Sequence, residues 1–275
     1  MTSTRAKRML APGPFRAEHI RSGDPYELSN GHAIFAPPTG RRGGRANLVG
    51  GEVLDTDPKV DSAGVDVGIS DGPRDLRAPD VSVGNIPNEP GWSTSAPPLA
   101  VEYADEGQDE DALHLKISEL LARGTRFIWV VRLAGKRCVE IHEKGKKLRV
   151  AMPGETLTAP GVLANPVPVE ALYDRDAAHE ATLRNLLNRK GFRDLAEVEE
   201  RGREEGREEG REEGRLVALR SAIRGVLDAR GLTSTRDQLA RIEHEMDVER
   251  LGRWLIAAAT VKTASLVFTT RPKRR

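Results

Sequence analysis

The sequence predicts an α/β domain with a mixed β-sheet flanked by helices, followed by a charged helical spacer and a small all-α module. Three observations predict this order. Short hydrophobic runs between residues 80 and 141 read as strands, and one amphipathic helical pattern separates them. A four-residue repeat of arginine, glutamate and glycine then occupies residues 201–215. After this repeat, hydrophobic residues return at helical spacing.

The composition suits a chain with both packed and solvent-exposed parts. Its 275 residues are enough for one α/β domain plus a smaller module. Hydrophobic residues make up 38% and charged residues 31%, so we expect part of the chain to be loop, tail or exposed helix. The formal net charge is only +1, so a nucleic-acid-binding surface would have to be local.

The cysteine content and the hydrophobic runs indicate in which cellular compartment the protein is expected. Cys138 is the only cysteine, which excludes an intrachain disulfide framework and a multi-thiolate zinc site. A reducing, cytoplasmic setting is therefore expected. The apolar run near the N-terminus is broken by Pro12 and Pro14, so no signal peptide is predicted. No run of about 18 apolar residues occurs, so no membrane-spanning helix is expected.

The N-terminal part of the sequence is irregular. Residues 1–25 are expected to be disordered or loosely ordered, because this region is rich in Gly, Pro, Arg and Asp. Short β-like pieces occur at 33–35 and 65–69. Residues 47–54 have some helical character, but Gly50 and Gly51 disfavour a helix there.

Residues 26–175 are expected to form the α/β domain. The order is strand, strand, helix, strand and strand, at 80–83, 99–103, 109–123, 127–131 and 137–141. The helix has acidic residues in its first turn and Gly124 as a C-terminal cap. The third strand is apolar throughout, as expected of a strand covered on both faces.

The C-terminal part of the sequence is predicted to be helical. Residues 176–215 form the charged spacer, in which glutamates three positions before arginines favour a helix. Its glycines weaken that helix by about 1 kcal/mol each. The repeat has no apolar stripe, which favours a solvated helix over a coiled coil. Residues 216–270 form the helical module, with Trp254 in its core, and 271–275 form a basic tail.

Two carboxylates on neighbouring predicted strands are candidates for metal binding. Asp80 opens the first strand, and Glu102 lies in the middle of the second, between the small residues Ala100 and Ala104. A carboxylate in the middle of an apolar strand is unfavourable unless it is paired or binds a metal. Hard cations such as Mg²⁺ prefer carboxylate and carbonyl oxygens, and they can activate water for phosphodiester hydrolysis.

Lys116 is the third candidate. It lies at the edge of the apolar face of the predicted helix, so its ammonium could reach back toward the sheet and orient or deprotonate a water molecule. His114 lies at the opposite edge, where amphipathic surface is the simpler explanation. Each of the three residues also has an ordinary structural explanation: Asp80 as a turn former, Glu102 in a salt bridge and Lys116 as a snorkelling side chain. Their order along the chain favours the joint interpretation.

Four stretches between Ala78 and Asp174 form a recognisable series: "APDVSVG", "GWSTSAPPLAVEYA", "LHLKISELLARGTRFIWVV" and "PVPVEALYD". This series resembles the Uma-type restriction endonuclease family, a branch of the PD-(D/E)XK nuclease superfamily. A fainter resemblance extends upstream through "YELSNGHAIFAPPTG". The resemblance implies a restriction-endonuclease-like α/β core that acts on DNA.

The resemblance also implies roles for particular residues. Asp80 and Glu102 would bind Mg²⁺, with Mn²⁺ as an alternative, and Lys116 would be the catalytic lysine. The backbone carbonyl of Tyr103 would be a further metal ligand. The usual lysine position of the superfamily, two residues after the glutamate, is Ala104 here, so the implied lysine is the one on the helix, as is typical of this branch.

Other departures from the family bear on activity more than on fold. The chain reads "ADEGQDED" after the Glu102 strand, and its first predicted helix lacks the histidine often found there. Glu52 is a candidate for the extra acidic residue that many such nucleases place on that helix, although an ordinary surface glutamate is the simpler explanation.

The spacer and the helical module resemble the C-terminal extension of some transposase-associated PD-(D/E)XK proteins. This implies a helper role in self-association or in substrate approach, with a neutral appendage as the alternative. The expected partners are DNA and a second copy of the chain, bound through a sheet edge or the C-terminal helices. Two other functions stay open: an inactive nuclease fold that binds nucleic acid or assembles proteins, and an interaction protein organised by the spacer.

Overall fold

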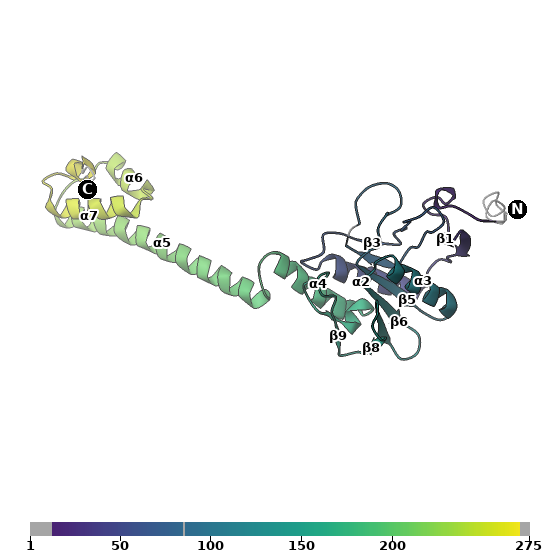
Figure 1. Ribbon diagram of the computed structural model, residues 1–275. Coiled ribbons are helices and arrows are strands. Elements are labelled where there is room, and N and C mark those ends of the chain that lie inside the picture. Colours follow the sequence, from purple (N-terminus) through teal and green to yellow (C-terminus); the bar gives the residue numbers. More distant parts are fainter. Residues whose placement is uncertain (1–12, 85, 270–275) are drawn as a thin grey trace. The chain divides into compact units, whose positions relative to one another are not determined.

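The structure is a computed structural model that describes residues 13–84 and 86–269 (Figure 1). The chain forms two compact units that divide between Asp194 and Leu195. The predictions for residues 1–12 and for the basic tail 271–275 lie outside the described residues.

A six-stranded mixed sheet forms the centre of the first unit. Its strand order is β3-β4-β5-β6-β7-β8, in which β5 and β6 are parallel and the other neighbouring pairs are antiparallel. The six strands are β3 (Ala63–Val65), β4 (Val81–Val83), β5 (Leu99–Ala104), β6 (Phe127–Arg132), β7 (Cys138–Glu143) and β8 (Arg149–Ala151). Two small antiparallel pairs lie outside this sheet: β1 (Tyr26–Ser29) with β2 (His32–Phe35), and β9 (Thr156–Leu157) with β10 (Val167–Pro168). The predicted α/β class and the predicted strands between 80 and 141 are confirmed.

Helices cover both faces of the sheet. One face packs against α2 (Arg41–Asp55), η2 (Val169–Leu172) and α4 (Arg175–Arg189), and the other packs against α3 (Glu110–Ala122). Side chains alternate between these faces along β5, because successive residues of a strand point to opposite sides. Val101 and Tyr103 lie in the core beneath α2, whereas Ala100 and Ala104 lie beneath α3. Glu102 therefore faces α3.

Helix α2 decides between two alternatives that the sequence left open for residues 47–54. Gly50 and Gly51 disfavoured a helix over residues 47–54, yet α2 runs from Arg41 to Asp55. A Cβ atom at position 50 would collide with the Tyr103 hydroxyl and crowd the Leu172 backbone. Glycine therefore allows the helix to lie close to the sheet, and this packing offsets the cost of about 1 kcal/mol that glycine imposes on a helix.

Helix α3 has the ends that the sequence predicted. The Asp109 side chain caps it by accepting a hydrogen bond from the Ala112 backbone N, and Glu110 and Asp111 lie in its first turn. Gly124 follows the helix with φ 108°, a left-handed conformation that favours glycine. These ends fix the register of the helix and hence the place of Lys116.

In the described part of the predicted loose N-terminus, residues 13–25, most residues are exposed and two are buried. This part contains the short 3₁₀-helix η1 (Ala17–His19), and both Ala17 and Ile20 are buried. Ile20 lies in a small hydrophobic cluster with Leu28 and Leu76. Ile20 thus contacts residues distant in sequence, and the expectation of a loosely ordered N-terminus stays a prediction.

The second unit has a hydrophobic core of its own, and it consists of helices. They are α5 (Leu195–Ala229), α6 (Arg236–His244), α7 (Val248–Thr260) and the 3₁₀-helix η3 (Ala264–Thr269). Trp254 is only 2% exposed, which confirms its predicted place in the core. Helices α6 and α7 are separate, because the Asp247 side chain caps α7 by accepting a hydrogen bond from the Arg250 backbone N.

The boundary between the units differs from the predicted start of the spacer at residue 176. Helix α4 packs against α2 through buried residues such as Ala178, Ala181 and Asn185, and so it belongs to the first unit. The repeat at 201–215 lies within α5 and is exposed. Within the described ranges, no helix combines the length and the apolarity needed to cross a membrane.

Candidate active site

Strands β4 and β5 bring two carboxylates together. Val81 pairs with Val101 in antiparallel register, and one further step of this register places Asp80 opposite Glu102. Asp80 Oδ2 also accepts a hydrogen bond from the Tyr103 backbone N, at 2.6 Å. Two carboxyl groups from neighbouring strands therefore lie on the α3 side of the sheet.

Helix α3 adds the candidate lysine to this pair. Lys116 Nζ lies 3.0 Å from Glu102 Oε2 and 2.7 Å from the Ala78 carbonyl oxygen, and it donates a hydrogen bond to each. It also forms an ion pair with Glu27 Oε1, at 3.1 Å. The structure thus brings Asp80, Glu102 and Lys116 into one site, with a largely buried ammonium between two carboxylates.

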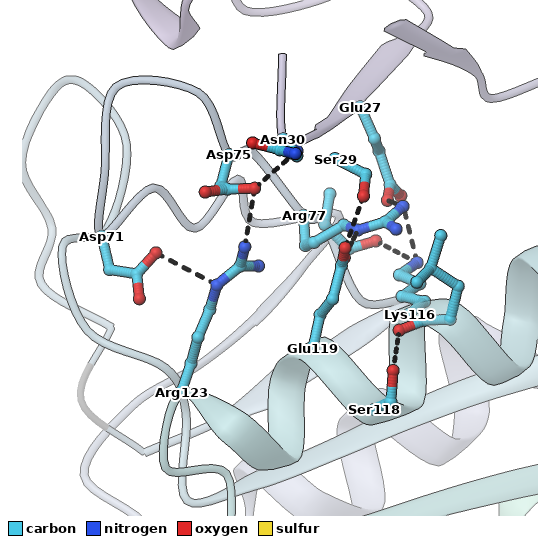
Figure 2. Close-up of polar contacts among 12 residues, drawn as sticks. Glu27, Ser29, Asn30, Asp71, Asp75, Arg77, Lys116, Ser118, Glu119 and Arg123 are labelled. Carbon is cyan, nitrogen blue, oxygen red and sulfur yellow. Dashed lines mark hydrogen bonds and ion pairs between the residues drawn. The ribbon is translucent and has the colours of Figure 1, made fainter. Parts of the chain in front are cut away.

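Glu27 is a site residue that sequence analysis missed. It comes from β1, far upstream in the chain. Arg77 pairs with its Oε2 at 3.1 Å, whereas Lys116 pairs with its Oε1. Arg77 is only 1% exposed and also pairs with Glu119 of α3. In Figure 2 the Arg77 guanidinium and the Lys116 ammonium both lie below the Glu27 carboxylate, and Arg77 also reaches Glu119. The faint upstream resemblance contains Glu27 but gave no reason to single it out.

Asp66 is a second acidic residue that was not singled out. It follows β3 with φ 51°, and its backbone N donates a hydrogen bond to the Asp80 carbonyl oxygen. Desolvation by the surrounding protein raises the pKa of Asp66, and the charge of Lys116 partly opposes this rise. Asp66 therefore adds negative charge at the edge of the site.

Burial and charge shift the pKa values of the central groups. Burial raises the pKa of Glu102 to about 8; Lys116 lowers this pKa, while Asp80 and Glu27 raise it further. Burial likewise raises the pKa of Asp80. For Lys116, burial lowers the pKa, but Glu102, Glu27 and Asp80 outweigh burial and leave it above its ordinary value. The site therefore contains more carboxylate charge than its ammonium can balance.

The shifted pKa of Glu102 leads to an expected pH dependence of stability. The folded, metal-free protein keeps the Glu102 proton up to about pH 8, whereas the unfolded chain releases it near the ordinary pKa of 4.5. Stability from this group is complete below pH 4.5 and is lost as pH rises toward 8. Urea unfolding in EDTA at several pH values should show this loss. The loss of stability with rising pH should be smaller in Glu102→Gln and unchanged in Glu52→Gln, the same substitution at an exposed residue. An equal loss in both variants would contradict the assignment of this pH dependence to Glu102.

The donor groups fit a hard divalent cation. Mg²⁺ is commonly held by one or two carboxylates together with waters, so Asp80 and Glu102 suffice in number. Glu102 Oε1 is buried and accepts no hydrogen bond, although it lies 2.9 Å from Lys116 Nζ. Among the described residues, no three His, Cys, Asp or Glu side chains are already arranged as a metal site. The fit therefore depends on the two carboxylates and a backbone oxygen.

The Tyr103 carbonyl can supply that oxygen. The Ala104 carbonyl accepts a hydrogen bond from the Leu133 backbone N, so it points toward β6. Neighbouring carbonyls of a strand point to opposite edges, and the carbonyl and N–H of one residue point to the same edge. The Tyr103 carbonyl therefore points toward β4 and Asp80, the direction in which its N–H is seen to point.

Two other residues raised by the sequence lie apart from this site. Glu52 is exposed on α2, the helix that covers the opposite face of the sheet, and it lines a small pocket with Val65 and Val81. His114 is exposed on α3.

A solved structure from Anabaena variabilis ATCC 29413 resembles part of this chain in fold. It is a crystal structure described as a putative nuclease belonging to DUF820, with a TM-score of 0.50 and 16% sequence identity, and the match covers 58% of this chain and 96% of that one. No protein-family model matches the sequence, and no curated protein shows a significant match to it. The likeness shows a nuclease-like fold, and it confirms the predicted restriction-endonuclease-like core.

Proposed function

We propose that this chain, which has a nuclease-like fold, is a metal-dependent endonuclease that hydrolyses phosphodiester bonds in DNA. Mg²⁺ would be its cation, with Mn²⁺ as an alternative. We further propose that it is a Uma-type member of the PD-(D/E)XK nucleases. The C-terminal helices would then be an extension like that of the transposase-associated proteins.

The observation that carries the proposal is the charge of the buried cluster. Four carboxyl groups and two cations contact or face one another in it: Glu27, Asp80, Glu102 and Glu119 with Arg77 and Lys116. Buried charges are costly unless they are paired. One divalent cation, by displacing the Glu102 proton, would balance the charge of the two surplus carboxylates. A nuclease fold with such a cluster at adjacent strand ends fits metal-assisted phosphodiester hydrolysis.

Each central residue has a role in this proposal. Asp80, Glu102 and the Tyr103 carbonyl would hold the cation, which when bound supplies Lewis-acid stabilisation of phosphate charge and activation of water. The raised pKa of Lys116 keeps it protonated at neutral pH. Lys116 would therefore orient the attacking water or a phosphate oxygen by donating hydrogen bonds, and would not act as a general base. Glu27, ion-paired to Lys116 and Arg77, would fix the direction of that ammonium.

A nuclease assay tests the proposal. Purified protein should nick supercoiled plasmid or cut single-stranded DNA with Mg²⁺ or Mn²⁺, and EDTA should abolish this cleavage. Binding of DNA without cleavage under any of these conditions would contradict the proposal and favour the inactive, nucleic-acid-binding alternative. The expected homodimer is a separate prediction, which this assay does not test.

A further inference from the structure

A groove of about 720 Å³ lies at the amino end of β6, away from the candidate active site. The turn between β7 and β8 and the segment around β9 form its walls. The groove is lined by Arg126, Phe127, Glu143, Lys144, Lys146, Arg149, Thr156, Thr158 and Pro160. Phe127 packs in the core beneath α2, whereas Glu102 faces α3. The groove and the carboxylate cluster therefore lie on different sides of the sheet.

The groove concentrates positive charge. Arg126, Lys144, Lys146 and Arg149 are all exposed, and Glu143 is the one carboxylate in the lining. Lys146 forms an ion pair with Glu143. Within the part of the chain that the structure describes, Lys144 and Arg149 have no ion-pair partner. For a chain with a formal net charge of +1, this is the kind of local positive surface that binding to a polyanion requires.

Arg126 is held in place within the groove. Its Nη2 donates a hydrogen bond to the Pro160 carbonyl at 2.6 Å, and its guanidinium lies 5.3 Å from the centre of the Phe127 ring. A Cβ at Gly161 would lie 3.2 Å from both terminal guanidinium nitrogens, so glycine leaves the room that Arg126 uses. A fixed guanidinium loses little conformational entropy on binding and suits bidentate phosphate recognition.

We propose that this groove binds phosphate groups of a nucleic-acid backbone, at a place separate from the bond that is cleaved. Its cations come from two segments of a surface-exposed groove, Arg126 and residues 144–149, an arrangement that suits successive phosphates. The hydroxyls of Thr156 and Thr158 add uncharged donors. The inference rests on the proposed function, because the bound polynucleotide is taken to be the substrate.

Binding measured without turnover tests this inference. Fluorescence anisotropy of labelled single-stranded and duplex oligonucleotides, in EDTA and at several salt concentrations, compares wild type with Lys144→Glu/Arg149→Glu. A double variant with the same charge change outside the groove, Lys136→Glu/Lys190→Glu, is the control. All four residues are exposed, and circular dichroism checks that both variants fold. The groove variant should lose at least about tenfold in affinity. The slope of the logarithm of the binding constant against the logarithm of the salt concentration should fall by about two in magnitude, and both changes should be much smaller in the control.

Three results would overturn the inference. They are unchanged affinity in the groove variant, equal losses in the groove and control variants, and displacement of the oligonucleotide by inorganic phosphate at a matched phosphate concentration. The last would assign the groove to a free anion. Oligonucleotide binding that depends on the groove, in a protein that never cleaves DNA, would support the groove and contradict the nuclease proposal alone.

Discussion

The variant Glu102→Gln is expected to lose metal-dependent DNA cleavage by roughly 10³-fold. Glutamine keeps the size of the side chain but removes the charge that would bind the cation beside Asp80. It also replaces the Glu102–Lys116 ion pair of 2.9 Å by a neutral contact, so that Glu27 and the Ala78 carbonyl alone hold the ammonium strongly. Nicking of supercoiled plasmid in Mg²⁺, followed over time for wild type and variant, gives the ratio of rates.

The matched control for this change is Glu52→Gln. Glu52 is exposed on the helix that covers the other face of the sheet, so the same chemical change there should leave cleavage within about twofold. Nicking by Glu102→Gln at the wild-type rate would remove Glu102 from the chemistry. Unchanged circular dichroism would show that a loss of activity does not come from unfolding.

The variant Lys116→Met is expected to destabilise the metal-free first unit by about 3–5 kcal/mol at pH 8, because removing one partner leaves buried charge uncompensated. Glu27 and Glu102 each form an ion pair with this ammonium, and both are at least nine-tenths buried. At pH 5 the loss should be smaller, because the raised pKa of Glu102 lets this carboxyl take up a proton. Mg²⁺ should restore part of the stability, since it would replace the missing positive charge.

Urea unfolding at both pH values, with and without Mg²⁺, measures these effects. The second unit has a separate core around Trp254, so its transition serves as a control within the same molecule and should not move. Lys136→Met removes an exposed lysine and should change stability by less than about 0.5 kcal/mol. Equal stability of Lys116→Met and wild type at pH 8 in EDTA would contradict the ion-pair cluster.

The parts of the site that local patterns encode were predicted from the sequence. Alternation along residues 99–103 placed Glu102 on the face opposite Val101 and Tyr103, and that is the α3 face in the structure. Helical spacing placed Lys116 at the edge of the apolar face of its helix, from which it reaches Glu102. Both placements depend only on the periodicity of one strand or one helix.

The rest of the site depends on contacts between distant segments. Glu27 and Arg77 are 50 positions apart, and nothing in either neighbourhood shows that β1 lies beside α3. A buried arginine looks the same in sequence as an exposed one, so the role of Arg77 could not be predicted. The role of Gly50 in α2 could not be predicted for the same reason. The close approach of Tyr103, which requires glycine at this position, exists only in the folded chain.

A metal centre at Asp80 and Glu102 is tested most directly by calorimetric titration of Mg²⁺ into wild type and Asp80→Asn at pH 8. Asparagine can still accept the hydrogen bond that the Tyr103 N–H gives to Asp80, so the fold of the strand pair is kept. Wild type is expected to bind Mg²⁺ at one saturable site, and Asp80→Asn to lose that binding. The same binding heat in both proteins, or none in wild type, would contradict a metal centre at these carboxylates.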